Sequence, residues 1–513
     1  MHRLTAILAA FLALVGLLTL FLLLERVRGQ AALARYKSEL IANGEKLSFG
    51  ELVRTVPESE NAARRFVEAV DQLGSGAVLP HNCPPMMKMR PSGRAIVGFR
   101  EPEWIEQGTY RDGEWVEEKV TNRWEQVAAD LQTNAAALAQ IRDALQRPIH
   151  KGLISTSNVS GLDITMLAAP KRAVQWFSAA AMSALHDGRM NEAAENLVAL
   201  IRLPSALAEG RLVISELVRF AVAAIAGATT WEALQADGWS DEALARLQEA
   251  WQADDFVASM ARSLDGERAY GQLMFDEFRR SNRAVTESLL FMRALALSDE
   301  SEDSGAGWLW GTSRKPALSV YSFIWRFAWL DQAERRHLEQ MQRLIEAARM
   351  AATNRSPVPI QTAISQLNVE LTNKNFYDKL RYPDPDPILT IAQSLKHALR
   401  AETDRALTVC AIALKRYQLS HGKLPESLEA LVPEFLSAVP IDYMDGKPLK
   451  YRLNPDGTFV LYSVGEDGTD NGADTSPLPG KERSRRRWDR RDVVWPLPAL
   501  PEEIEAYRKE MAE

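Results

Sequence analysis

The sequence predicts a mainly α-helical protein with an N-terminal transmembrane helix and a small C-terminal α+β module. Three observations support this prediction. An uncharged apolar run opens the chain, from Leu4 to Leu24. Apolar residues then recur at spacings of three and four over most of residues 122–297, which is the period of an amphipathic helix. Near the C-terminus, short strand-like runs replace that pattern and are separated by turns rich in glycine, proline and aspartate.

The composition is that of a folded protein with sizeable hydrophobic cores. Of the 513 residues, 46% are apolar and 25% are charged, which is close to the average for globular proteins. A chain of this length is expected to form about two to four domains. The formal net charge of −7 disfavours a dedicated nucleic-acid-binding protein, which normally carries a basic face. Two cysteines, Cys83 and Cys410, are too few for a disulfide scaffold and do not identify the compartment.

The run from Leu4 to Leu24 predicts a membrane anchor. As a helix, its 21 residues span about 31 Å, which matches the roughly 30 Å hydrocarbon core of a bilayer. A cleaved signal peptide has a shorter apolar region, about 7–15 residues, with a small-residue cleavage site close behind it. A buried helix of a soluble protein is disfavoured because every face of the run is apolar. We therefore expect residues 1–29 to form an uncleaved anchor that contacts the membrane through residues 4–24.

Residues 30–297 are expected to form a helical domain with an irregular insertion near residues 80–120. The first helix, Gln30–Asn43, ends before Gly44, and glycine is typical just past the C-terminus of a helix. In the insertion, strand-like runs flank Asp112-Gly113, which predicts a β-hairpin. Residues 180–203 resemble a single tetratricopeptide-type hairpin, although no repeat follows at a fixed period. Further helices are predicted at 61–73, Trp124–Leu145, Ala173–His186, Asn191–Leu203, Leu212–Ala236 and Asp241–Trp251.

Residues 298–315 have the composition of a linker, and residues 316–400 are expected to form a further helical segment. Within that segment, Pro316–Leu330 is apolar apart from Arg326 and is too short to span a bilayer. Two interpretations remain open, a buried core helix or an interfacial helix that lies on the membrane near the anchor. A long helix is predicted at Asp331–Ala352, and clustered prolines at residues 383–387 precede the last module.

Residues 401–498 are expected to form the α+β module, followed by a C-terminal tail at residues 499–513. The module begins with a helix at Thr403–Gln418 that has one apolar face. Two strands are predicted at Leu449–Leu453 and Thr458–Ser463, joined by a hairpin loop. An acidic, glycine-rich loop, Gly465–Asp474, follows the second strand.

This order of elements resembles the globular part of the major pseudopilin of type II secretion systems. That family has a helix ending in tyrosine, a G-x-x-P-x-S-L-x-x-L segment, two short strands and a Y-S-x-G-x-D-G loop. The resemblance covers about residues 401–495. The matching residues are Tyr417, Gly422, Pro425, Ser427, Leu428, Leu431, Tyr451, Tyr462, Ser463, Gly465, Asp467 and Gly468.

The chain also departs from the pseudopilin pattern. Tyr443 stands where the family's turn has proline, and the anchor lacks the prepilin-peptidase site. Lys481–Arg491 is an additional basic segment, which is either a solvated loop or a contact for an anionic surface. We therefore interpret the region as a pseudopilin-like module reused in another protein, and not as a pilus subunit.

The resemblance implies a structural calcium site in the loop after the strands. Similar pseudopilins bind Ca²⁺ there, and Ca²⁺ prefers many hard oxygen ligands. Asp467, Asp470 and Asp474 are the candidate ligands, and Asp489 and Asp492 join them if the chain folds back. The alternative interpretation is a solvated acidic loop, because aspartate, glycine and asparagine are ordinary turn residues.

The flanking charges and the C-terminal module favour different orientations of the anchor. Arg26, Arg28, Arg35 and Lys37 outnumber Arg3 on the other flank, which favours a cytoplasmic body by the positive-inside rule. The very short N-terminal tail suits a signal anchor that exports the following chain, and the pseudopilin resemblance implies the same. We expect a single-pass protein of the bacterial inner membrane whose body lies on the periplasmic side.

No motif in the sequence indicates a catalytic activity. None of the seven histidines forms a His-x-x-x-His or His-Glu-x-x-His motif. His81 and Cys83 supply two metal ligands without an evident third. The serine nucleophile elbow, the Ser-x-x-Lys pair and the Walker loop are also absent from the sequence.

The sequence thus favours a non-catalytic envelope scaffold or interaction protein. Its partners would be the membrane and another envelope protein, and not a nucleic acid. The alternative is an envelope hydrolase with an unrecognised carboxylate-based site in the helical domain. Carboxylate pairs meet only in the folded protein, so the sequence alone leaves that alternative open.

Overall fold

The fold is mainly helical and contains a long apolar helix at the N-terminus, as predicted, with 68% of the described residues in helices. The computed structural model describes residues 2–52, 57, 61–74, 85–111, 114–147, 167–206, 210–298, 315–383, 387–484 and 486–512. The expected linker, residues 298–315, lies outside these described residues except at its two ends.

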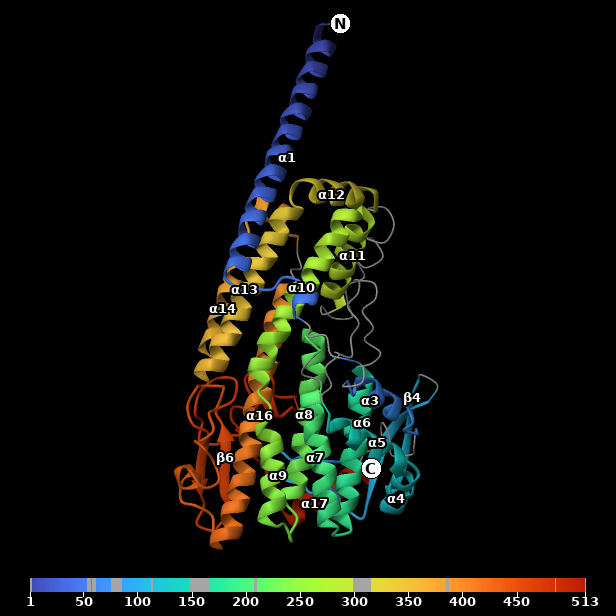
Figure 1. Ribbon diagram of the computed structural model, residues 1–513, viewed down its shortest axis with the longest axis vertical. Coiled ribbons are helices and arrows are strands. Elements are labelled where there is room, and N and C mark those ends of the chain that lie inside the picture. Colours follow the sequence, from blue (N-terminus) through green and yellow to red (C-terminus); the bar gives the residue numbers. More distant parts are fainter. Residues whose placement is uncertain are drawn as a thin grey trace.

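A single helix, α1 (His2–Ala42), contains both the expected anchor and the amphipathic helix predicted behind it. Its first half projects from the body (Figure 1), and nearly all side chains of residues 7–24 are exposed. No proline interrupts the helix, and Gly44, with φ +82°, follows its end. The expected anchor boundary at residue 29 therefore falls within continuous helix.

Two helices of the described chain are long and apolar enough to cross a membrane, α1 and α8 (Val213–Leu234). They differ in their surroundings. The apolar part of α1 is not buried by the body, whereas more than half of the apolar window of α8 is buried inside it. These surroundings fit a single-pass anchor in α1 and a core helix in α8.

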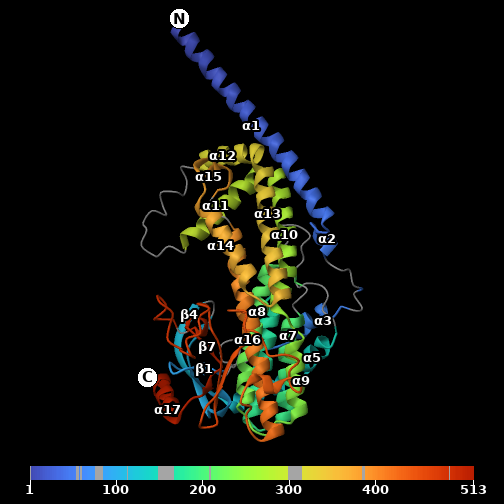
Figure 2. The ribbon, with the colours of Figure 1, turned by 90° about the vertical axis from the view of Figure 1, so that its left-hand side faces the viewer.

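The second half of α1 packs along α13 (Leu330–Asn354), and Figures 1 and 2 show the two helices side by side. Leu338 of α13 forms a small hydrophobic cluster with Leu33 and Leu40 of α1. A Cβ atom on Gly29 would lie 3.0 Å from Gln332 Cγ, so the glycine permits a close approach of the two helices. The buried residues of this half of α1 form one helical stripe: Glu25, Gly29, Leu33 and Leu40.

The remaining helices extend the body away from the anchor (Figure 2). The half nearer the anchor contains α2 (Phe49–Leu52), α10 (Phe256–Arg280), α11 (Asn282–Ser298), α12 (Lys315–Ala328), α14 (Val358–Thr372) and α15 (Phe376–Arg381). The far half contains α3 (Ala63–Asp71), α4 (Trp124–Thr133), α5 (Ala135–Leu145), α6 (Ala168–His186), α7 (Met190–Ala206) and α9 (Asp241–Gln252). The helix α16 (Ile388–His421) continues from one half into the other.

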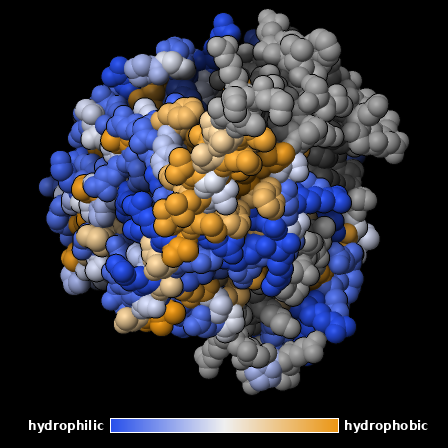
Figure 3. All heavy atoms as spheres, turned by 90° about the horizontal axis from the view of Figure 1, so that it is seen from above, coloured by the Kyte–Doolittle hydropathy of each residue, from blue (hydrophilic) through white to orange (hydrophobic). Residues whose placement is uncertain are grey.

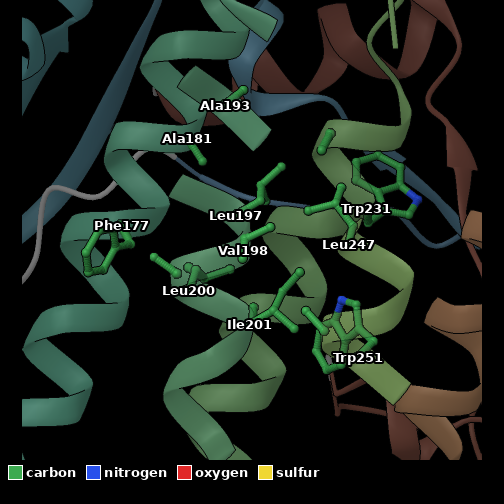
Figure 4. Packing of buried hydrophobic residues seen from close by; sticks show 14 of the residues in the cluster. Phe177, Ala181, Ala193, Leu197, Val198, Leu200, Ile201, Trp231, Leu247 and Trp251 are labelled. Carbon is green, nitrogen blue, oxygen red and sulfur yellow. The ribbon is translucent and has the colours of Figure 1, made fainter. Parts of the chain in front are cut away.

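Two large hydrophobic cores stabilise these halves. The far core is packed around Trp231 and Trp251 with leucines of α7 and α9, including Leu197, Leu200 and Leu247 (Figure 4). The helices α8 and α16 contribute buried residues to both cores. The boundary expected between residues 400 and 401 therefore falls inside α16, because one helix supplies side chains to two cores.

The strands form three small sheets. In the insertion, β3 (Glu103–Arg111) pairs with β4 (Glu114–Arg123), which confirms the predicted hairpin. In the C-terminal module, β5 (Lys450–Leu453) pairs antiparallel with β6 (Phe459–Ser463), and β7 (Val493–Val494) pairs with β6. This small sheet agrees with the α+β character predicted for the C-terminal part.

The third sheet joins the insertion to the C-terminus. The strand β2 (Arg94–Ile96) pairs antiparallel with β1 (Lys88–Met89) and in parallel with β8 (Leu497–Pro498). The segment expected as a tail forms the helix α17 (Pro501–Ala512), which contacts β3. An ion pair joins Arg508 Nε to Glu101 Oε2 at 2.7 Å. The last residues are therefore docked on the insertion.

Candidate functional site

A polar socket holds α1 at the point where its apolar stretch ends. Glu25, the first charged residue after that stretch, is buried against α13 and α15. Its Oε2 atom accepts hydrogen bonds from Gln332 Nε2 and from the Tyr377 hydroxyl, both at 2.8 Å. A buried carboxylate is stable only when donors replace its lost hydration. These contacts therefore favour one position of α1 relative to the body.

A second carboxylate, the half-buried Glu45, fixes the chain just after α1. It accepts hydrogen bonds from Arg349 Nη1 at 2.6 Å, Arg268 Nη2 at 2.8 Å and Gln342 Nε2 at 3.0 Å. Burial opposes ionisation of the Glu45 carboxyl, but these hydrogen bonds outweigh it and lower its pKa to about 2.

We call these contacts between α1 and the body the anchor clamp. Lys37 lies between Glu25 and Glu45 in the sequence. Its Nζ is 2.5 Å from Oε1 of Glu334, a residue of α13 whose side chain is fully buried. Sequence reasoning missed the clamp, because charges on an amphipathic helix normally face solvent. The anchor clamp consists of Glu25, Lys37, Glu45, Arg268, Gln332, Glu334, Gln342, Arg349 and Tyr377.

The predicted calcium ligands Asp467, Asp470 and Asp474 lie on one loop, and the chain folds back so that Asp492 reaches this loop. Asp492 is buried and accepts hydrogen bonds from the backbone N–H groups of Asn471 at 3.3 Å and Asp474 at 2.9 Å. Burial raises the pKa of the Asp492 carboxyl, against the effect of these donors. Asp492 therefore helps to hold the acidic loop closed.

The other acidic side chains of the loop have partners of their own. Asp467 accepts a hydrogen bond from the Thr469 N–H, and Asp489 accepts one from the Ser484 hydroxyl. Asp470 lies 3.7 Å from Lys450 Nζ, and Asp474 lies 3.7 Å from Arg491 Nε. Across the described ranges, no three histidine, cysteine or acidic side chains form a group that would hold a metal. Calcium binding stays a prediction.

Two features that depart from the pseudopilin pattern take part in packing. Tyr443 is buried in the core near the anchor, and its N–H donates to Thr403 Oγ1 at 3.2 Å. In the basic segment, Arg487 Nη1 and Trp488 Nε1 both donate to the carboxylate of Asp404, at 2.6 and 2.9 Å. The basic segment is therefore partly docked on α16.

The hydrolase alternative requires a pocket with convergent carboxylates. A cavity of about 690 Å³ lies between α9, α16 and residues 433–443, and its lining includes Asp254, Asp255 and Glu402. Asp255 caps α10, since its Oδ1 accepts from the Ala258 N–H at 2.8 Å. Glu402 accepts from the Phe256 N–H at 2.9 Å. Two of these three carboxylates thus stabilise the start of α10, and Glu434 is a fourth carboxylate of the lining.

The third carboxylate, Asp254, belongs to a buried ionic network. Its Oδ1 accepts from Arg219 Nη2 at 2.6 Å, and Arg219 Nη1 donates to Glu216 Oε2 at 3.0 Å. Burial raises the pKa of the Glu216 carboxyl, although Arg219 opposes that shift. Asp254 Oδ2 is buried and has no hydrogen-bond partner among the described residues. Within the described ranges, it is the one carboxylate oxygen of Asp254 and Glu216 without a hydrogen-bond partner.

Other buried titratable groups have structural surroundings. Glu232 accepts backbone hydrogen bonds from Met87 at 2.7 Å and Gly98 at 3.0 Å, and burial raises its pKa to about 8. Burial lowers the pKa of His337 to about 4 and raises the pKa of the Cys410 thiol, so both groups are neutral at pH 7. The predicted pair His81 and Cys83 lies outside the described residues.

Comparisons of the chain with family models, curated proteins and solved structures found no match. The pseudopilin and tetratricopeptide resemblances therefore stay predictions.

The low pKa of Glu45 predicts a pH-dependent contribution to stability. Because folding lowers this pKa from about 4.5 to about 2, the contribution is complete above pH 4.5 and is lost as the pH falls towards 2. Glu45→Gln is expected to lower the free energy of unfolding by about 3 kcal/mol at pH 7, since Arg268 is left buried without this carboxylate. Denaturant unfolding in detergent micelles measures the difference between variant and parent.

Glu39, which is exposed near the end of α1, provides the control for this measurement. Glu39→Gln is expected to leave the free energy of unfolding nearly unchanged at every pH. Equal stability of the Glu45→Gln variant and the parent at pH 7, or a difference that persists on acidification, would contradict the role given to Glu45.

The calcium prediction is tested by metal addition to the full chain. A site formed only in the folded state stabilises that state, so Ca²⁺ at concentrations above about 10⁻³ M is expected to raise the melting temperature. The double variant Asp470→Asn, Asp474→Asn should lose this increase. No shift for the parent protein, together with no binding heat in calorimetric titration, would rule the site out.

Proposed function

We propose that this chain is a non-catalytic scaffold of the bacterial envelope. The apolar half of α1 crosses the inner membrane, and the body, on the periplasmic side, presents a binding surface to another envelope protein. The observation that carries the proposal is the continuity of α1, whose two halves are one helix with different surroundings.

The anchor clamp makes this scaffold rigid. A flexible linker behind a membrane helix would let the body rotate and tilt freely. Here, Glu25 and Glu45 are held by the body at the two ends of the docked half of α1, and a leucine cluster lies between them. The body is therefore expected to keep a fixed geometry relative to α1, which suits a protein that places a partner at a defined distance from its anchor.

The length of the body supports the same function. The helix α16 has 34 residues and is therefore about 51 Å long, and it leads from the half near the anchor to the far half. The C-terminal sheet and α17 lie in the half of the body opposite the free end of α1 (Figure 1). A partner bound there would be held well away from the bilayer surface.

A groove in the far half offers a surface for such a partner. It has a volume of about 340 Å³ and lies between the insertion and the C-terminal module. Its methionines, Met86, Met87 and Met89, adapt readily to apolar side chains. Its charged lining comprises four basic residues, Lys88, Arg90, Arg487 and Arg490, and two acidic residues, Asp492 and Glu510. We expect the partner segment to combine apolar and acidic residues.

Site-specific photocrosslinking in intact cells tests this proposal. The photoreactive residue p-benzoylphenylalanine replaces Met89 in the groove or, as the control, Met350, which is exposed on α13. Position 89 is expected to capture one envelope protein, identified by mass spectrometry, and Arg490→Glu should weaken the capture. No product at position 89, or the same product from both positions, would contradict the proposal.

The second candidate function, an envelope hydrolase, depends on the unpartnered Asp254 Oδ2 beside the cavity of about 690 Å³. It would replace the scaffold proposal if the purified full chain hydrolysed an envelope glycan or peptide and Asp254→Asn abolished the activity without unfolding the protein. The cap and ion-pair roles of the cavity carboxylates favour the scaffold.

A further inference from the structure

The helix α12 presents an apolar stripe that the described part of the body covers only in part. Val320 is 61% exposed and Phe323 is 56% exposed, and Ile324 and Phe327 are half-buried beside them. These positions follow the i, i+3, i+4, i+7 spacing of one helix face. In a water-soluble helix this outward face would normally be polar.

The opposite face of α12 is already occupied. Trp325 is buried, and its Nε1 donates to the Arg381 carbonyl at 2.8 Å. The Tyr321 hydroxyl donates to the Leu380 carbonyl at 2.8 Å, and Ser322 is fully buried. The helix is thus docked through one face, and Ile324 and Phe327 at the edge of the stripe contact the same hydrophobic cluster. Val320 and Phe323 are left exposed.

The stripe lies at the level where α1 leaves the body. The Arg26 guanidinium lies over the Phe327 ring, 4.8 Å from its centroid, and Leu22 packs against the hydrophobic cluster that contains Trp325. The rings of Phe21 and Tyr377 are 6.1 Å apart. Since the uncharged run of α1 ends at Leu24, the body reaches about 4–5 Å into the level of that run.

The neighbouring start of α15 adds to the same surface. Phe376 is 79% exposed and precedes Tyr377, which contacts α1 through both Phe21 and Glu25. Seen from the end at which α1 projects, apolar residues, those of α1 among them, gather in the middle of this face, and hydrophilic residues lie to the left of and below them (Figure 3). Arg28, whose side chain is 79% exposed, supplies positive charge close by.

We propose that α12 and Phe376 form a second, interfacial contact with the phospholipid bilayer. An amphipathic helix at an interface buries its apolar face about 5–10 Å into the headgroup and acyl boundary, which agrees with the depth that the contacts of α1 imply. The occupant is the bilayer because the stripe is continuous with the apolar surface of α1, and exposed arginine favours anionic headgroups. The inference rests on the proposed anchoring by α1.

This contact has a consequence for the scaffold. A single spanning helix restrains the depth of a protein in the bilayer but not its rotation about an axis in the membrane plane. A second contact beside it, on a helix that lies across the direction of α1 (Figure 1), restrains that tilt. The body would then stand at one angle to the membrane.

Fluorescence quenching in lipid nanodiscs tests the inference on the full chain. Single cysteines replace Phe323, Val358 or Leu17 in a Cys83→Ser background, and the buried Cys410 is retained. Each cysteine carries the environment-sensitive dye NBD, and the lipids carry a spin label near the headgroup. Val358 is the matched control, because it is 57% exposed but lies at the start of α14, the end away from α12.

The dye at position 323 is expected to emit at shorter wavelength than at position 358 and to be quenched by the labelled lipid. Quenching should increase when anionic lipid is included. A dye at 323 that behaves like the one at 358, while the dye at 17 is lipid-exposed, would overturn the second contact and leave the anchor intact. Absence of lipid exposure at 17 would instead overturn the anchor.

A protein occupant of the stripe would give a different result. If a second copy of this chain covered α12, the emission at position 323 would depend on the number of chains per nanodisc and not on the lipid label. That outcome also contradicts the proposal. The variant Val320→Lys, Phe323→Lys provides an independent check, since it should abolish quenching of a dye at position 376 while the protein stays in the membrane fraction.

Discussion

One helix must satisfy two different surroundings, and the rest of the structure depends on that constraint. The first half of α1 needs an apolar environment on every side, whereas its second half needs the body along one stripe. Because the helix is continuous, any orientation that the bilayer imposes on the first half passes to the second. The close approach at Gly29 and the carboxylates of the anchor clamp then pass it to α13 and the body.

The body is suited to transmit such an orientation over its length. The helices α8 and α16 supply side chains to both large cores, so the two halves share a hydrophobic interior. The insertion and the C-terminus are joined by the β2–β8 pairing and by the ion pair of Arg508 with Glu101. Glu232 ties the insertion to α8 through backbone hydrogen bonds. The chain therefore folds back on itself and does not form a row of separate modules.

Much of the fold could be predicted from local patterns in the sequence. The length and apolarity of residues 4–24 predicted the long N-terminal helix, the three- and four-residue spacing predicted the helices, and Asp112-Gly113 marked the hairpin between β3 and β4. The parallel pairing of β2 with β8 could not be predicted, because such short strands carry no periodic signal and their partners are about 400 residues apart in sequence.

The candidate site was less accessible to sequence reasoning. Glu25, Lys37 and Glu45 have the ordinary composition of an amphipathic helix and its end, and only the fold brings buried partners from α10, α13 and α15 to them. For the acidic loop, the sequence makes Asp492 a candidate ligand only if the chain folds back. The structure has this fold-back and places the Asp492 carboxylate against the backbone of the loop. Backbone donors and neighbouring cations contact the carboxylates of the loop, and calcium binding there stays a prediction.

The proposed function depends on the division of α1 into one half surrounded by lipid and one half packed against the body. Its most direct test is a scan of single cysteines through residues 7–42, reacted with a water-soluble maleimide in broken membranes that expose both faces. Residues 7–24 should resist the reagent, and beyond them reactivity should follow a helical period, low at positions 29, 33 and 40 and high at position 41. Uniform reactivity beyond residue 25, or ready reaction within residues 7–24, would contradict the account.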